Sequence, residues 1–167
     1  MRFSPVPRYA FPRLTDVTAD FLRGIGVTLL LLDLDNTVAP YGAKLPSEAV
    51  LQWLSELKNS GVRLFFISNN RQRGRVERFA EAMEIGYVKA AGKPSPRAVL
   101  ETVRRMGVTP SQTALAGDQV YTDVLAANRA GVVSIAVRPL RLKNPILAIR
   151  YALEAPFRMM RRGGDDN

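Results

Sequence analysis

Two aspartates that lie close together in the sequence are the first candidates for chemistry. In Asp33-Leu-Asp35-Asn-Thr37 they follow an apolar run. Residues i and i+2 of a strand point to the same side, so Asp33 and Asp35 can share one pocket. Neighbouring carboxylates repel each other, and such pairs usually keep one proton or hold a cation. The pair therefore suits proton transfer, nucleophilic attack or metal binding. A polar turn at a strand end is the simpler alternative.

A hydroxyl and a lysine stand at comparable positions farther along the chain. Ser68 ends a second apolar run and is followed by Asn69, and its hydroxyl could donate to a phosphoryl oxygen. Lys93 precedes a helix that we expect Ser95 to cap, and a cation beside a helix N-terminus favours a bound phosphate. Taken alone, Ser68 is more simply a strand-end cap and Lys93 a solvated side chain.

A second acidic pair lies in the segment Gly117-Asp-Gln-Val-Tyr-Thr-Asp123. Asp118 could complete a magnesium site, because Mg²⁺ prefers a few carboxylates together with water. The alternative is structural: Asp118 would cap the next helix, and Asp123 would be an acidic residue of its first turn.

Alternating strands and helices would bring these residues to one edge of a sheet. The continuous apolar run at 27–33 is typical of a strand buried on both faces, and apolar spacings of three and four residues predict helices. The pattern predicts an α/β fold with a doubly wound, mostly parallel sheet, which binds ligands at the carboxyl ends of its strands. We expect strands at 27–33, 62–68, 87–90, 113–117 and 132–137, and helices at 47–59, 76–83, 96–106, 121–129 and from Asn144 onward.

The composition excludes several kinds of catalysis. The 167 residues are 47% hydrophobic and 23% charged, as in a folded domain, and include no cysteine and no histidine. Disulfides, thiolate metal sites, the Ser-His-Asp triad and histidine-bound zinc are therefore excluded. Catalysis would have to use carboxylates, hydroxyls, lysine, arginine and a hard metal ion.

The chain is strongly basic, with 24 Lys and Arg against 15 Asp and Glu and a net charge of +9. This charge favours an anionic partner, whether nucleic acid, an anionic membrane or a phosphorylated substrate. No apolar stretch approaches the roughly 20 residues of a membrane-spanning helix, and the first residues lack the apolar centre of a secretory signal. We therefore expect a cytoplasmic protein and leave peripheral membrane contact open.

The ordered set of an aspartate pair, a hydroxyl, a lysine and a second acidic pair resembles the four motifs of the haloacid dehalogenase (HAD) superfamily of phosphotransferases. The matching residues are DLDNT at 33–37, Ser68, Lys93 and GDQVYTD at 117–123. With Gly131 and VRPL at 137–140, the chain is similar to subfamily IIIA members of the YqeG type, which are similar to phosphatidylglycerophosphate phosphatases. The resemblance covers residues 3–155 and implies a three-layer, Rossmann-like HAD fold.

The resemblance also implies catalytic roles. Asp33 would be the nucleophile that forms an aspartyl-phosphate, and Asp35 would protonate the leaving oxygen and then activate water. The residues themselves do not decide which of the two aspartates attacks.

Substrate and metal ligands are implied in the same way. The substrate would be bound by Thr37, which also steadies its loop, and by Ser68, Asn69 and Lys93, of which Ser68 and Lys93 hold phosphoryl oxygens and offset their charge. Mg²⁺ would be held by Asp33, the carbonyl of Asp35, Asp118 and, in support, Asp123.

Many HAD enzymes carry a cap domain between their motifs, and this chain lacks room for one. Only residues 38–61 separate Thr37 from Val62, and only residues 71–92 separate Asn70 from Lys93. Each span is filled by one predicted helix. An uncapped site admits a bulky substrate such as a lipid head group or a macromolecule.

Two basic segments bear on the substrate. Arg71, Arg73, Arg75 and Arg78 follow Ser68 and could hold a second phosphate, or could form a solvated helix face. Residues 144–162 combine apolar side chains with four arginines and suit an amphipathic helix on anionic lipid, or a helix docked on the sheet.

These observations predict a Mg²⁺-dependent phosphatase with an N-terminal arm (1–25), a catalytic domain (26–143) and a basic helix with a polar tail (144–167). The preferred substrate is a phosphate monoester such as phosphatidylglycerophosphate. A soluble or nucleic-acid phosphate ester is the second hypothesis. The third is a non-enzymatic module that binds phosphate on RNA or a membrane, although binding alone needs no nucleophile. The sequence leaves the oligomeric state open.

Overall fold

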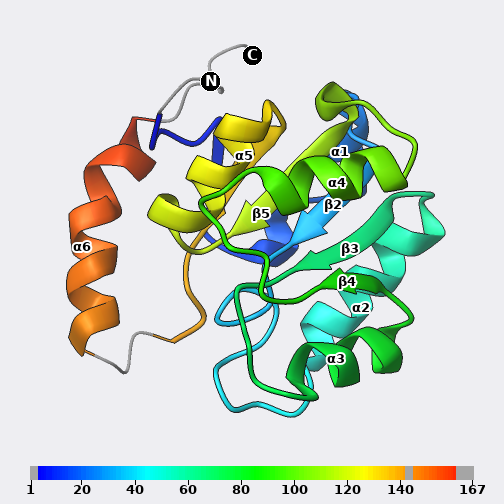
Figure 1. Ribbon diagram of the computed structural model, residues 1–167, viewed down its shortest axis with the longest axis horizontal. Coiled ribbons are helices and arrows are strands. Elements are labelled where there is room, and N and C mark those ends of the chain that lie inside the picture. Colours follow the sequence, from blue (N-terminus) through cyan, green and yellow to red (C-terminus); the bar gives the residue numbers. More distant parts are fainter. Residues whose placement is uncertain (1–3, 142–144, 161–167) are drawn as a thin grey trace.

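The computed structural model describes residues 4–141 and 145–160. Within these residues, six strands form one parallel sheet in the order β1-β6-β5-β2-β3-β4 (Figure 1). The α/β class and the parallel sheet expected from the sequence are confirmed. The strands are β1 (Tyr9–Phe11), β2 (Leu29–Leu32), β3 (Arg63–Ile67), β4 (Gly86–Val88), β5 (Thr113–Gly117) and β6 (Val133–Val137).

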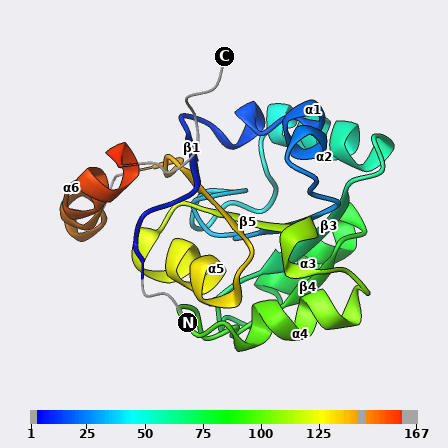
Figure 2. The same cartoon turned by 90° about the horizontal axis from the view of Figure 1, so that it is seen from above.

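Helices cover both faces of the sheet, which makes three layers (Figure 2). Helices α1, α2 and α3 pack on one face, and α4 and α5 pack on the other. The helices are α1 (Ala19–Gly24), α2 (Glu48–Asn59), α3 (Arg75–Met83), α4 (Arg97–Arg105), α5 (Leu125–Ala130) and α6 (Pro145–Met159), with short turns η1 (Leu14–Asp16), η2 (Pro110–Gln112) and η3 (Val120–Val124).

The central position of strand β2 in the sheet explains why its sequence is apolar without alternation. Leu30 and Leu32 pack toward the α2 side of the sheet, whereas Leu29 and Leu31 pack toward α4 and α5. All four leucines are fully buried. Burying a leucine contributes about 1.5–3 kcal/mol, so both faces of this central strand stabilise the fold.

Three local features differ from the sequence expectations. Strand β1 was not predicted, because it has only three residues and lies at the sheet edge, where Tyr9 pairs with Ile135 of β6. The expectation that Ser95 caps α4 is wrong: Pro96 holds the cap position and the helix begins at Arg97. The expected helix at 121–129 begins as the π-helical turn η3. The division of the chain at residues 25 and 143 stays a prediction.

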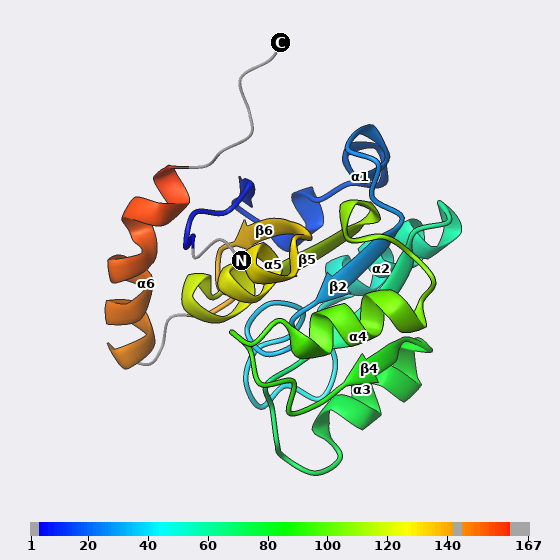
Figure 3. The ribbon, with the colours of Figure 1, turned by 45° about the horizontal axis from the view of Figure 1, so that its top comes forward.

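Helix α6 stands beside the β1 edge rather than on a face of the sheet (Figures 1 and 3). Its inner side carries the buried Glu154, whose carboxylate accepts a hydrogen bond from the Tyr121 backbone N–H, and Phe157, which packs edge-on against the Tyr121 ring. Its outer side exposes apolar side chains. The expected cap at Asn144 and the segment 161–167, with two of the four tail arginines, lie outside the described residues. No helix among the described residues is long and apolar enough to cross a membrane.

Candidate active site

Three neighbouring strands bring the predicted residues to one edge of the sheet. Strand β2 pairs with β3 on one side and with β5 on the other, all parallel. Their carboxyl ends are therefore adjacent, and Asp33, Ser68 and Asp118 each follow directly after one of them. This is the edge at which open α/β sheets bind ligands.

Three buried aspartates form the centre of this edge. One carboxylate oxygen from each of Asp33, Asp118 and Asp123 lies within 4.8 Å of the others. Lys93 reaches into the group with a side chain that is 1% exposed: its Nζ lies 2.6 Å from Asp33 Oδ1 and 2.6 Å from Asp123 Oδ1. Nζ also donates to the Ile67 carbonyl at 2.7 Å. Lys93 is therefore an internal counter-ion and not a solvated side chain.

The charges of this group do not balance. Burial raises the pKa of Asp33 to about 7, although the charge of Lys93 opposes it. Burial, and then the charges of Asp33 and Asp123, raise the pKa of Asp118 well above its ordinary value. Burial works to lower the pKa of Lys93, but the charges of Asp123 and Asp33 outweigh it and raise that pKa. The lysine stays charged, and it is outnumbered by carboxylates.

This donor set fits a hard divalent cation. Oxygen ligands from buried carboxylates suit Mg²⁺, and the cation would offset the negative charge that Lys93 leaves uncompensated. Asp123 Oδ1 is buried and is paired with the ammonium of Lys93 at 2.6 Å. Asp33, Asp118 and Asp123 could therefore bind a metal ion. The side chain of Asp35 does not belong to this group.

Thr37 connects the first and last motifs. Its hydroxyl accepts a hydrogen bond from the Asp118 backbone N–H at 3.0 Å and lies 3.2 Å from Asp118 Oδ1, to which it donates. Asn36, with a left-handed φ of 66°, places its side-chain amide 3.4 Å from Asp118 Oδ2. The loop after β2 therefore holds the Asp118 carboxylate from one side.

A glycine lets Asp123 approach the end of β5. A Cβ atom at Gly117 would lie 2.3 Å from Asp123 Cγ, closer than side chains can pack. The other oxygen of this carboxylate, Oδ2, accepts a hydrogen bond from the Gln119 backbone N–H at 3.0 Å. The π-helical turn η3 thus carries Asp123 back over the strand end.

Ser68 and Asn69 lie between Asp35 and Lys93 in the chain. Ser68 is buried, and its Oγ accepts a hydrogen bond from the Asn70 backbone N–H at 3.1 Å. The Asn69 amide bonds the Lys93 backbone twice, donating to its carbonyl at 2.9 Å and accepting from its N–H at 2.8 Å. Asn69 therefore positions the lysine main chain.

The motifs and their geometry agree with the comparisons. The model of haloacid dehalogenase-like hydrolases matches residues 13–131. The chain belongs to this family. It is 33% identical over 124 residues to the probable phosphatase YqeG of Bacillus subtilis, covering 74% of this chain and 72% of that protein. It is also 33% identical over 101 residues to a glyceraldehyde 3-phosphate phosphatase of Methanopyrus kandleri, covering 56% of this chain but only 43% of that protein. The predicted enzyme class, a HAD-type phosphatase, is confirmed.

Solved structures support the same fold. The 3-deoxy-D-manno-octulosonate 8-phosphate phosphatase of Yersinia pestis superposes with a TM-score of 0.55 at 16% identity, covering 87% of this chain and 89% of that one. The cobalt-bound deoxy-D-mannose-octulosonate 8-phosphate phosphatase of Haemophilus influenzae gives a TM-score of 0.53 at 14% identity, covering 80% and 90%. At these identities the likeness shows the HAD fold alone.

In this HAD hydrolase the carboxylate of Asp35 has partners different from those of Asp33. Arg75 Nε donates to Asp35 Oδ1 at 2.6 Å, and Asn70 Nδ2 donates to Asp35 Oδ2 at 2.6 Å. Asp33 instead contacts Lys93. The two aspartates lie at one strand end, but each has its own cation.

The basic cluster after Ser68 is divided by burial. Arg71, Arg73 and Arg78 are exposed, as a solvated face requires. Arg75 is buried, so neither expectation for the cluster describes it. The sequence carried a sign of this: Arg75 and Phe79 are four residues apart and share a helix face, and Phe79 belongs to the apolar face of α3. Asn70 had no comparable sign.

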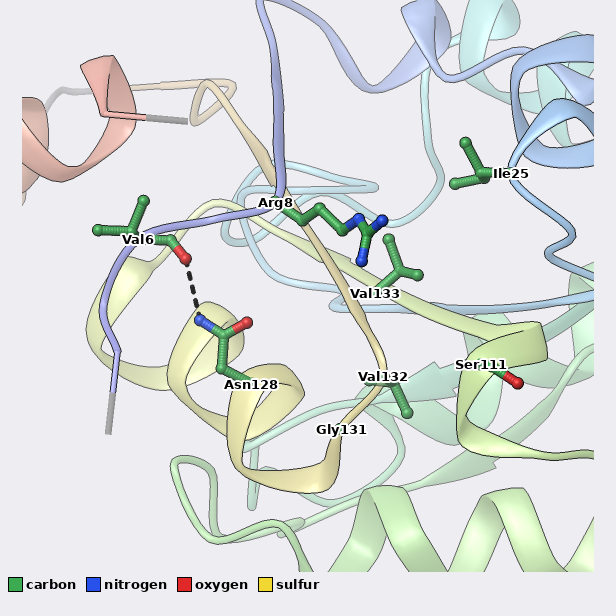
Figure 4. A pocket seen from close by; sticks show the side chains of 8 residues that line it. All are labelled: Val6, Arg8, Ile25, Ser111, Asn128, Gly131, Val132 and Val133. Carbon is green, nitrogen blue, oxygen red and sulfur yellow. Dashed lines mark hydrogen bonds between the residues drawn. The ribbon is translucent and has the colours of Figure 1, made fainter. Parts of the chain in front are cut away.

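A cavity of about 600 Å³ opens at the opposite edge of the sheet, where β5 and β6 begin (Figure 4). Arg8, Ser111 and Asn128 supply its polar lining, and the valines at 132 and 133 part of its apolar lining. No acidic side chain is among the described residues that line it. This hollow is therefore separate from the motif residues.

Proposed function

We propose that this chain hydrolyses phosphate monoesters through an aspartyl-phosphate on Asp33, with Mg²⁺ as its divalent cation. The observation that carries the proposal is the placement of Asp33 beside Lys93 and opposite Asp118 and Asp123. Lys93 and Ser68 would bind the phosphoryl oxygens, and Asn69 and Thr37 would hold the loops that border them. A bound Mg²⁺ would offset the charge of the phosphoryl group.

The proposed reaction has two steps. An Asp33 oxygen attacks phosphorus, the bond to the leaving oxygen breaks, and Asp35 gives its proton to that oxygen. A water molecule then loses a proton to Asp35 and attacks phosphorus, which breaks the Asp33–phosphate bond and releases inorganic phosphate. Burial removes water from the Asp33 carboxylate, and this desolvation raises its pKa to about 7.

Assays with and without metal test this function. Purified protein should release phosphate from at least one member of a panel of lipid, sugar and nucleotide phosphate esters when Mg²⁺ is present. EDTA should stop the release and added Mg²⁺ should restore it. Asp33→Asn is the matched control, because it keeps the shape of the side chain but cannot attack phosphorus. A wild-type protein that hydrolyses no ester with any divalent cation contradicts the proposal.

As the substrate we propose a lipid phosphate such as phosphatidylglycerophosphate, presented at an anionic membrane. Residues 38–61 contain only the helix α2, and residues 71–92 contain only α3 and β4, so these spans hold no cap domain, which suits a bulky ester. Ile149 and Leu153 lie one helical turn apart on α6 and are 62% and 64% exposed, and Met159 and Met160 near the end of the helix are exposed as well. A net charge of +9 favours anionic lipid.

Vesicle binding separates this substrate from a soluble phosphate ester. Ile149→Gln with Leu153→Gln should weaken salt-sensitive binding to anionic vesicles by roughly tenfold, because two apolar side chains no longer enter the interface. Hydrolysis of a lipid phosphate should fall, while a small aryl phosphate should be hydrolysed as before. Tyr87→Gln is the matched control, because this exposed side chain lies on β4 at the other sheet edge. Absence of vesicle binding at low salt would favour the soluble ester.

A further inference from the structure

The guanidinium of Arg75 joins three separate parts of the active-site edge. Its Nε donates to the Asp35 carboxylate at 2.6 Å, its Nη1 to the Ala43 carbonyl at 2.7 Å and its Nη2 to the Pro40 carbonyl at 3.0 Å. The side chain is 5% exposed and its guanidinium carbon lies 5.2 Å from the centre of the Phe79 ring. Each guanidinium nitrogen is therefore already donating a hydrogen bond within the protein.

These contacts leave Arg75 poorly suited to bind substrate. A second phosphate would have to displace the Asp35 carboxylate or the two carbonyls from a buried guanidinium. The exposed Arg71, Arg73 and Arg78 have no such constraint. The planar fork of arginine suits several fixed acceptors, which the ammonium of a lysine cannot match.

Both oxygens of the Asp35 carboxylate are held from the α3 side. Arg75 binds Oδ1, and Asn70, in the loop before α3, binds Oδ2 at 2.6 Å. The carboxylate plane is thereby defined by two donors on rigid neighbours. The loop at 40–43, which follows Asp35 in the chain, is tied to the same guanidinium.

We propose that Arg75 is the positioning residue for Asp35, with Asn70 in support. The inference rests on the proposed function, in which Asp35 transfers the proton of the leaving group. In a domain whose described residues contain no cap, the orientation of this carboxylate has to come from the domain itself. Arg75 supplies it by linking Asp35, the 40–43 loop and the start of α3 into one unit. A misplacement of about 1 Å in a reacting group can cost about 10²-fold in rate.

Leaving-group dependence tests the proposal. An alkyl phosphate needs a proton on its leaving oxygen, whereas 4-nitrophenyl phosphate does not. In a single turnover, Arg75→Met should slow the phosphorylation of Asp33 by about 10²-fold for the alkyl ester and by less than about tenfold for the aryl ester, with little change in KM. Arg75→Lys should lose less than Arg75→Met, because it keeps the charge but not the fork. Asn70→Ala should lower the rate with the alkyl ester more than the rate with the aryl ester, as Arg75→Met does, but by smaller factors.

Controls separate positioning from general damage. Arg104→Met removes an exposed arginine from the last turn of α4 and should leave the rates with both esters unchanged. Millimolar guanidinium added to Arg75→Met should restore part of the activity on the alkyl ester and little on the aryl ester. If Arg75→Met does not fold, Arg75→Lys and Asn70→Ala provide the same comparison of the two esters.

Three results would overturn the inference. Equal losses in the rate of Asp33 phosphorylation by both esters would mean that Arg75 only supports the fold. A raised KM with unchanged kcat would mean that it binds substrate. A leaving-group-dependent loss in Asp35→Asn that the Arg75 and Asn70 variants do not share would leave the proposed function standing and refute the positioning role. A wild type without activity on either ester refutes the proposed function itself.

Discussion

The two edges of the same sheet differ in what they bury. At the carboxyl edge, Asp33, Asp118 and Asp123 surround Lys93 with almost no exposure to water. At the amino edge, a cavity of about 600 Å³ is lined by the exposed Arg8 and by neutral residues. No acidic side chain is among the described residues that line this hollow, whereas the carboxyl edge buries several charged groups. Buried charge costs free energy and is retained where chemistry needs it, so charge and not volume locates this site.

The largest difference between the edges is expected from Asp33→Asn. An amide cannot attack phosphorus, so phosphatase activity should fall by on the order of 10³-fold or more. The far-UV circular dichroism spectrum should be unchanged, because the two side chains have nearly the same shape. Substantial turnover in this variant would show that Asp33 is not the nucleophile.

A smaller loss is expected from Asp118→Asn at the same edge. The amide oxygen can still approach a cation, but one negative charge is lost and the hydrogen bonds with Thr37 are disturbed. The Mg²⁺ concentration for half-maximal activity should rise by about tenfold or more, since ligands near Mg²⁺ set its affinity. An unchanged Mg²⁺ titration would exclude Asp118 from the metal site.

The unbalanced charge at this edge should also make the free energy of unfolding depend on pH. Burial raises the pKa of Asp33 to about 7, so between about pH 4 and 7 the metal-free folded protein holds a proton that the unfolded chain has released. The free energy of unfolding should therefore decrease as pH rises through this window. Asp118, whose pKa is also raised, acts in the same direction.

Thermal unfolding in EDTA and in Mg²⁺ measures this effect. In EDTA, Tm should be lower at pH 8 than at pH 5, and Mg²⁺ should raise Tm more at pH 8, where the carboxylates are ionised. Asp33→Asn should reduce the slope, because the variant lacks the titrating group. A metal-free Tm that rises between pH 5 and 8 would contradict the charge imbalance.

The smallest effect is expected at the amino edge. Arg8→Ala with Ser111→Ala removes polar side chains from the cavity, and both residues are exposed. Kinetic constants should stay within about twofold and the free energy of unfolding within about 0.5 kcal/mol. Kinetic assays and urea titration check both values. A loss of activity comparable to that of Asp118→Asn would end the contrast between the edges.

Local patterns in the sequence predicted the elements that bury many apolar side chains. Strand β2 was expected because its leucines run without interruption, and α2 because Val50, Trp53, Leu54 and Leu57 share a face. Strand β1 was missed because pairing with β6, more than a hundred residues away, defines it and its own residues do not. Helix α4 begins at Arg97, with Pro96 and not Ser95 at the cap position, which differs by one residue from the start that the sequence indicated.

The sequence by itself predicted which polar residues of this protein meet at one edge of the sheet. The order of Asp33, Ser68 and Asp118 was sufficient for this, because each follows directly after a parallel strand and the carboxyl ends of such strands meet at one edge. Only the tertiary structure decided how they are paired. It placed Lys93 between Asp33 and Asp123, and it turned Asp35 toward Arg75, which is buried whereas Arg71, Arg73 and Arg78 are exposed. Such pairings depend on contacts between residues far apart in the chain, which no local pattern records.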